Sequence, residues 1–165
     1  MNRIIIIFTG FLSFQMLFIG ITQAQGVSKD WATEYMNMYL QAKFDQLKKK
    51  YLDENVTFLE SSSNLSIKGV DKVMAYWKKT FADIKGKHFQ VNQVFSSGAS
   101  YVVVHGKARF DYRASALGLK QEGYIKIDIP MSVVLKVRNK RIIHQADYTD
   151  SYEFMKQVKA QMKKQ

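Results

Sequence analysis

Arg109, Asp111 and Asp147 are the residues whose types and spacing are best suited to chemistry in this sequence. Arg109 and Asp111 stand two positions apart in a β-branched, alternating stretch that predicts a strand over 101–114. Side chains with that spacing lie on the same face of a regular strand, so a guanidinium and a carboxylate share one face. Asp147 lies in the last predicted strand, over 141–149, and supplies a second carboxylate.

The pattern leaves two placements open for Arg109 and Asp111. In one, both side chains point into an apolar pocket. In the other, they form an ion pair on the outer face of the sheet, because the residues between and around them form an apolar face on the opposite side of the strand: Val102, Val104, Ala108, Phe110 and Tyr112.

Other kinds of reactive site lack the residues that they need. His88, His105 and His144 are single residues on separate strands and the chain has no cysteine, so we predict no metal site. No serine occupies a nucleophile elbow, and no glycine-rich loop is suited to phosphate, so we predict no cofactor. Asp150, at the junction of the last strand and a closing helix, is interpreted as a helix cap.

The elements that must position these residues follow from periodicity. Helical spacing predicts two helices over 28–52 with a bend near Lys43, and a third helix that Gly69 opens and that runs to Phe81. Alternating or β-branched runs predict strands over 55–60, 89–95, 101–114, 124–137 and 141–149, before a closing helix over 151–164. Helices first and a meandering sheet afterwards indicate an α+β domain with helices packed on one sheet face.

The first residues have the order of a secretory signal peptide. Arg3 precedes an apolar stretch from Ile4 to Ile21, and a small residue, Ala24, stands at the predicted cleavage site. We therefore expect a signal peptide over 1–24 and a single exported domain over 25–165, periplasmic or extracellular, with no stable membrane anchor after cleavage. An uncleaved anchor is the alternative, because the apolar stretch is nearly long enough to span a bilayer.

The chain is strongly basic, with 25 Lys and Arg against 14 Asp and Glu. Removing residues 1–24 takes one cation, Arg3, and lowers the formal net charge from +11 to +10. This balance permits binding to nucleic acid, lipid headgroups or acidic polysaccharide, but the cations are scattered and no nucleic-acid motif occurs. We interpret them as a solvated surface.

Three segments carry a resemblance to a known family. They are Lys68-Gly69-Val70-Asp71 before the third helix, Tyr76-Trp77 within it, and the stretch 141–150 with its Asp-Tyr-x-Asp ending. In this order the chain resembles the nuclear transport factor 2-like superfamily, especially its SnoaL-like branch, over about residues 31–158. The resemblance implies a cone, in which a curved antiparallel sheet wraps around the N-terminal helices (nuclear transport factor 2-like, also called cystatin-like), with a C-terminal helix and an apolar pocket open at one end.

The resemblance also implies which residues form that pocket. Aromatic residues of the helices and the first strand are expected in the core and along the pocket floor, together with the apolar side of strand 124–137. The predicted lining is Trp31, Tyr35, Tyr39, Phe58, Trp77, Phe81, Ile129, Met131 and Val133.

A weaker likeness to limonene epoxide hydrolases assigns roles to the first three residues. It implies that Asp147 is the base, Asp111 the acid and Arg109 the cation that holds both, since two carboxylates in an apolar pocket acquire different pKa values. That family also positions a water with Tyr and Asn on the first short strand. The matching positions here are Phe58 and Glu60, and Phe58 cannot hold a water.

Three functions remain open from the sequence. The leading one is an exported domain that binds an apolar small molecule. The second is an acid-base hydrolase or isomerase that uses Asp147, Asp111 and Arg109. The third is an interaction module that forms a homodimer through an apolar sheet face that the helices leave uncovered.

Overall fold

The computed structural model describes residues 27–97 and 100–162. The predicted signal peptide over 1–24 lies outside this range. None of the helices in the described range is both long enough and apolar enough to cross a bilayer.

Three helices form one layer of the fold. α1 (Lys29–Leu40) begins at Ser28, whose hydroxyl accepts a hydrogen bond of 3.1 Å from the Trp31 backbone N–H. α2 (Phe44–Lys50) follows after the predicted bend. α3 (Val70–Phe81) begins directly after Gly69, which has a φ of 96° that favours glycine. The predicted helix boundaries in this half of the chain are confirmed.

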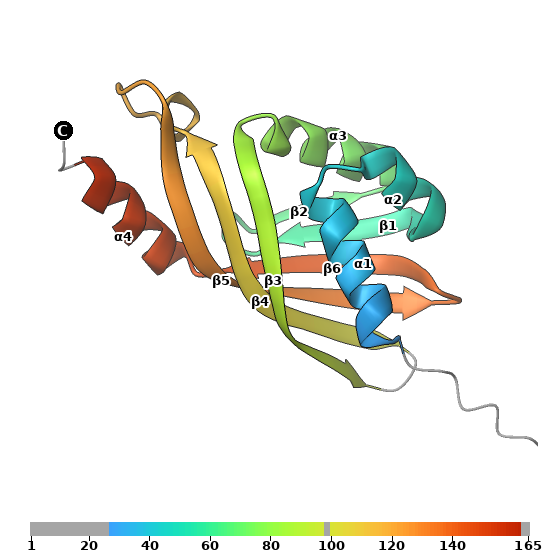
Figure 1. The fold of residues 1–165 in the computed structure, drawn as a ribbon. Coiled ribbons are helices and arrows are strands. Elements are labelled where there is room, and N and C mark those ends of the chain that lie inside the picture. Colours follow the sequence, from blue (N-terminus) through green and yellow to red (C-terminus); the bar gives the residue numbers. More distant parts are fainter. Residues whose placement is uncertain (1–26, 98–99, 163–165) are drawn as a thin grey trace, which may run out of the picture.

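The second layer is a curved six-stranded sheet with the order β2-β1-β6-β5-β4-β3 (Figure 1). The last four strands of the chain form the predicted antiparallel meander, and β1 pairs with β6 in parallel. The short strand β2 and the parallel pairing are additional to the prediction. The strands are β1 (Leu52–Glu60), β2 (Leu65–Lys68), β3 (Ile84–Ser97), β4 (Tyr101–Arg113), β5 (Tyr124–Arg138) and β6 (Arg141–Thr149), with a 3₁₀ turn, η1 (Ala114–Leu117), after β4.

The core lies between the sheet and helices α1, α2 and α3. Along β5 every second residue from Ile125 to Val137 is buried. On the helical side, Tyr35, Leu47 and Trp77 are at most 1% exposed. Apolar burial of this kind is the main favourable term in folding, so it determines which face of each strand points inward.

The last helix, α4 (Ser151–Met162), lies along the edge of β5 rather than over the face that α1, α2 and α3 cover (Figure 1). β6 pairs with β5 only from Met131 onward, so the first half of β5 has a free edge on that side. Two glutamines of α4 pair with this edge. Gln157 exchanges hydrogen bonds of 2.9 and 2.8 Å with the backbone N–H and C=O of Asp128, and Gln161 does the same at Lys126, at 3.0 and 2.7 Å.

Replacing Gln157 and Gln161 together by Leu should weaken the attachment of α4. The double variant loses four hydrogen bonds at the β5 edge, each worth about 1 kcal/mol before water partly replaces it, so we expect a net loss of roughly 1–3 kcal/mol. The measurement is urea unfolding followed by circular dichroism. Lys159→Gln on the exposed side of α4 is the matched control and should change the unfolding free energy by less than about 0.5 kcal/mol. Equal stability of the two variants would contradict the pairing.

Candidate functional site

A cavity of about 140 Å³ lies between the helices and the inner face of the sheet. Its floor consists of buried side chains and its rim of half-buried ones, so it extends from the core to the surface. Most of the wall is apolar or aromatic. The lining residues come from α1, β1, α3 and the inner faces of β3 to β6: Tyr39, Leu40, Phe58, Glu60, Tyr76, Trp77, Thr80, Phe81, Ile84, Lys87, Ala108, Phe110, Met131, Asp147 and Thr149.

The wall includes five of the nine residues that the resemblance assigned to it: Tyr39, Phe58, Trp77, Phe81 and Met131. The other four lie elsewhere. Tyr35, Ile129 and Val133 are buried in the core, and Trp31 is half-buried against it.

Sequence reasoning missed part of the wall. Phe110 was assigned to the apolar face of β4, and the same alternation places it in the cavity. Tyr76 is adjacent to Trp77 on α3, and this position next to a predicted lining residue indicates that Tyr76 lies near the cavity. Lys87 gave no indication, because it lies in a part of β3 that was not predicted as strand.

Asp147 is the buried ionisable residue of this wall with the largest network of polar contacts. The residue is 2% exposed, and both of its carboxyl oxygens accept hydrogen bonds. The Tyr39 hydroxyl donates to Oδ2 at 2.8 Å, and Gln145 Nε2 donates to Oδ1 at 2.7 Å. The Tyr35 hydroxyl in turn donates to Gln145 Oε1, which fixes the orientation of the amide. Asp147 is thus part of a buried, hydrogen-bonded chain of four polar side chains: Tyr35, Gln145, Asp147 and Tyr39.

This hydrogen-bonded chain of side chains forms because the residue spacing on α1 is nearly equal to the residue spacing on β6. Tyr35 and Tyr39 are one helical turn apart on α1, about 6 Å along its axis, and their rings are stacked. Gln145 and Asp147 are two positions apart on β6, between about 6 and 7 Å, and share the inner face. Each tyrosine hydroxyl therefore meets one polar group of the strand.

Burial raises the pKa of Asp147 from 3.8 to about 7. The hydrogen bonds from Gln145 and Tyr39 favour the ionised form and oppose this rise, while the charge of Glu60 adds to it. Burial and the charge of Asp147 also raise the pKa of Tyr39 well above its usual value, so Tyr39 stays a neutral donor. The site therefore holds a carboxyl group that exchanges its proton near neutral pH.

Arg109 and Asp111 do not join Asp147, which corrects the predicted triad. The strand register aligns Asp147 with Val133 and Val133 with Val104. Arg109 lies an odd number of positions from Val104 along β4 and therefore points to the opposite, outer face of the sheet. The alternation had established that Arg109 and Asp111 share a face, but the apolar residues between them occupy the inner one.

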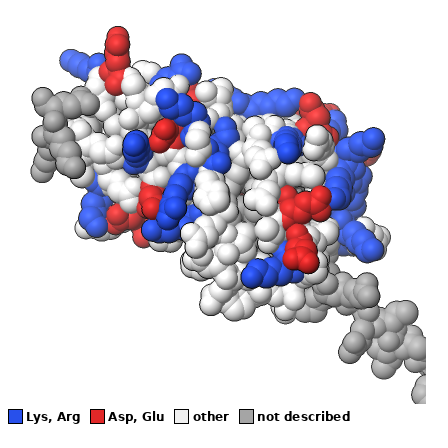
Figure 2. All heavy atoms as spheres, viewed as in Figure 1, with Lys and Arg blue, Asp and Glu red and all other residues white. Residues whose placement is uncertain are grey.

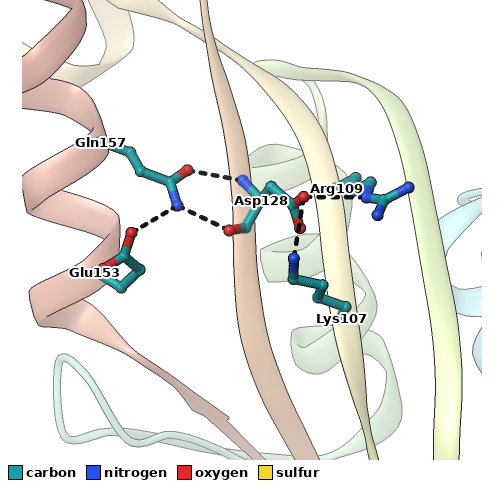
Figure 3. Close-up of polar contacts among 5 residues, drawn as sticks. All are labelled: Lys107, Arg109, Asp128, Glu153 and Gln157. Carbon is teal, nitrogen blue, oxygen red and sulfur yellow. Dashed lines mark hydrogen bonds and ion pairs between the residues drawn. The ribbon is translucent and has the colours of Figure 1, made fainter.

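On the outer face Arg109 pairs with β5. Its Nε lies 3.1 Å from Asp128 Oδ2, and Lys107 Nζ lies 3.3 Å from the same oxygen (Figure 3). The three side chains are 41–52% exposed, so these pairs contribute little stability. Asp111 is on the same face, opposite Lys126. The outer side of β4 and β5 is thus charged at these positions, and the homodimer stays a prediction.

No group of three or more metal-ligating side chains occurs in the range 27–97 and 100–162. On the face of the molecule in Figure 2, Lys and Arg are interspersed with Asp and Glu and form no continuous basic patch.

The pKa of Asp147 makes stability depend on pH. Between pH 4 and 7 the folded protein keeps a proton that the unfolded chain has lost, so the free energy of unfolding falls as pH rises through this window. Asp147→Asn cannot titrate. The free energy of unfolding of this variant, relative to that of the parent, should rise from pH 4 to 7 by at most about 4 kcal/mol and stay constant above pH 7. Urea unfolding of both proteins from pH 4 to 8 measures this, and parallel curves would contradict it.

Solved structures of the same fold lie at low sequence identity. A protein from Shewanella denitrificans OS-217 described as a SnoaL-like polyketide cyclase aligns with a TM-score of 0.70 and 20% identity over 78% of this chain and 94% of its own. A protein from Catenulispora acidiphila DSM 44928 with a ketosteroid isomerase-like fold, in complex with trimethylamine, aligns with a TM-score of 0.60 and 15% identity. The alignment covers 76% of this chain and 89% of that protein. An LEH-like epoxide hydrolase from M. tuberculosis aligns with a TM-score of 0.59 and 14% identity, over 76% of this chain and 84% of its own.

A comparison with curated proteins finds no match. The sequence does match a family model, that of the SnoaL-like polyketide cyclases, over residues 29–158. This range runs from the first residue of α1 into α4 and includes every strand that forms the cavity. The chain therefore belongs to the SnoaL-like polyketide cyclase family, within the nuclear transport factor 2-like superfamily.

Proposed function

We propose that this domain binds a small, largely apolar molecule in the cavity, with one polar group of that molecule facing Asp147. The observation that carries the proposal is the buried Asp147 carboxyl in a wall that is mostly apolar or aromatic. Pockets of this composition, with a few convergent polar groups and a perturbed pKa, are typical of ligand sites. The rim of half-buried residues supplies a path of entry.

The size of the cavity limits the ligand. An apolar cavity of roughly 150 Å³ holds one benzene molecule. At about 140 Å³ the cavity matches a single ring or a branched molecule of similar size. A larger molecule, such as a polycyclic polyketide, would extend past the rim. Trimethylamine, present in the C. acidiphila neighbour, is within this size.

Proton transfer by Asp147 is the second candidate function. A carboxyl group with a pKa of about 7 is present in both protonation states near neutral pH, which suits a general acid or base. As a base, Asp147 would take a proton from the carbon beside a carbonyl group and, as the acid so formed, return a proton to the resulting enolate. This version needs neither Arg109 nor Asp111, which lie on the outer face.

Cyclohexanone in deuterated buffer tests both functions, because its ring matches the cavity. Chemical shift changes should report binding, and loss of the α-proton resonances should report proton transfer. The exchange rate should rise through pH 7 as Asp147 ionises and fall at least tenfold in Asp147→Asn.

Two variants serve as controls. Asp111→Asn makes the same chemical change on the outer face and should behave as the parent does. Ala108→Leu adds three carbon atoms to the cavity wall and should reduce binding. Binding that Ala108→Leu leaves unchanged would place the ligand elsewhere and remove the proposal. Binding without exchange would leave a binding protein and remove the catalytic version.

We also propose that the domain works outside the cytoplasm, in a periplasm or the extracellular space. The proposal rests on the charge, apolar stretch and small residue of 1–24. In the host cell, the exported protein should have the intact mass of a chain beginning at Gln25. A membrane-bound product that retains residues 4–21 would contradict it.

A further inference from the structure

Aromatic side chains are the most frequent kind in the cavity wall. Tyr39 and Trp77 meet edge to face, with ring centroids 4.8 Å apart, and Phe58 meets Trp77 in the same way at 5.5 Å. Rings in these orientations present faces and edges in different directions, and a ring face attracts cations. Six aromatic residues contribute to the wall: Tyr39, Phe58, Tyr76, Trp77, Phe81 and Phe110.

Two carboxyl groups share one side of the same cavity. Glu60 of β1 and Asp147 of β6 are register partners in the parallel pair, and both line the cavity. Neither forms an ion pair with any Lys or Arg of the described residues. Among the described residues, Glu60 accepts side-chain hydrogen bonds from Ser62 alone, and its charge acts on Asp147. This wall is negatively charged when both groups are ionised and has no counter-ion of its own.

Of the described residues that line the cavity, one is cationic, and it lies on the other wall. Lys87 belongs to β3, at the opposite end of the strand order from β1. Its Nζ donates to the Ile84 carbonyl at 2.9 Å and lies 5.2 Å from the centroid of the Phe81 ring. Lys87 therefore interacts with its own strand and an aromatic ring, which shows that this wall already accommodates a cation.

We propose that the cavity binds a small organic cation of the trimethylammonium class, with aromatic rings around its methyl groups and the carboxylates of Glu60 and Asp147 as its counter-charge. This inference rests on the proposed small-molecule function and specifies its ligand. A methylated ammonium group suits the wall because it needs few hydrogen-bond acceptors, is weakly hydrated and attracts ring faces. A metal ion would require several oxygen or nitrogen ligands, and no group of three or more metal-ligating side chains occurs among the described residues.

Choline and 3,3-dimethylbutan-1-ol form a matched pair of probes. They have the same shape, and the alcohol has carbon in place of the charged nitrogen. At pH 8, where Asp147 is ionised, choline should bind to the parent protein at least tenfold more tightly than the alcohol does. Isothermal titration calorimetry at constant ionic strength gives both dissociation constants.

Three variants separate charge from shape. Glu60→Gln removes one carboxylate from the wall and should weaken choline binding about tenfold while leaving the alcohol unchanged. Asp111→Asn removes the same charge from the outer face and should change the binding of neither choline nor the alcohol. Lys87→Met removes a like charge from the cavity and should strengthen choline binding several-fold.

The outcomes distinguish this inference from the function on which it rests. If the alcohol binds as tightly as choline, or if Glu60→Gln and Asp111→Asn weaken choline equally, the cation inference is wrong and the small-molecule site stands. If neither probe binds, and cyclohexanone does not bind either, the proposed function is wrong as well. Preference for choline that depends on Glu60 supports both.

Discussion

The burial of Asp147 is the constraint on which the arrangement of the rest depends. A carboxyl group removed from water is costly unless polar partners surround it, and here they come from two elements distant in sequence. α1 must cross the sheet at the place where Tyr39 reaches β6. β6 must therefore lie inside the sheet, with β1 and β5 on its two sides. The curvature of the long strands then leaves a space in front of the carboxyl group that side chains only partly fill.

One geometric match occurs twice in the molecule. Residues four apart on a helix and two apart on a strand have nearly equal spacings, so a helix can present two polar groups to one strand. α1 uses this match to hold side chains of β6, and α4 uses it to satisfy the backbone of β5. The first arrangement creates the reactive group of the cavity. The second closes the sheet where its neighbouring strand ends.

The periodic parts of the fold were predictable because they depend on local burial. The helix break near Lys43, the start of α3 after Gly69 and the four-strand meander all follow from apolar spacing. The pairing of β1 with β6 was not predictable in this way, since it joins segments about ninety residues apart. For the site, alternation indicated that Arg109 and Asp111 share a face. Alternation could not decide whether that face points inward or outward, because the apolar face of β4 has the same sequence pattern whether it packs against the helices or forms an interface with another molecule.

The position of α4 has a consequence for how the protein behaves in a concentrated solution. A strand with unpaired backbone groups is a template for strands of other molecules, and natural sheets protect such edges with charges, bulges or covering segments. The first half of β5 would be an edge of this kind, long and apolar on one side. Gln157 and Gln161 occupy its donors and acceptors with side-chain amides, which cannot propagate a sheet. α4 therefore occupies, at this edge, backbone groups with which a strand of another molecule could otherwise pair.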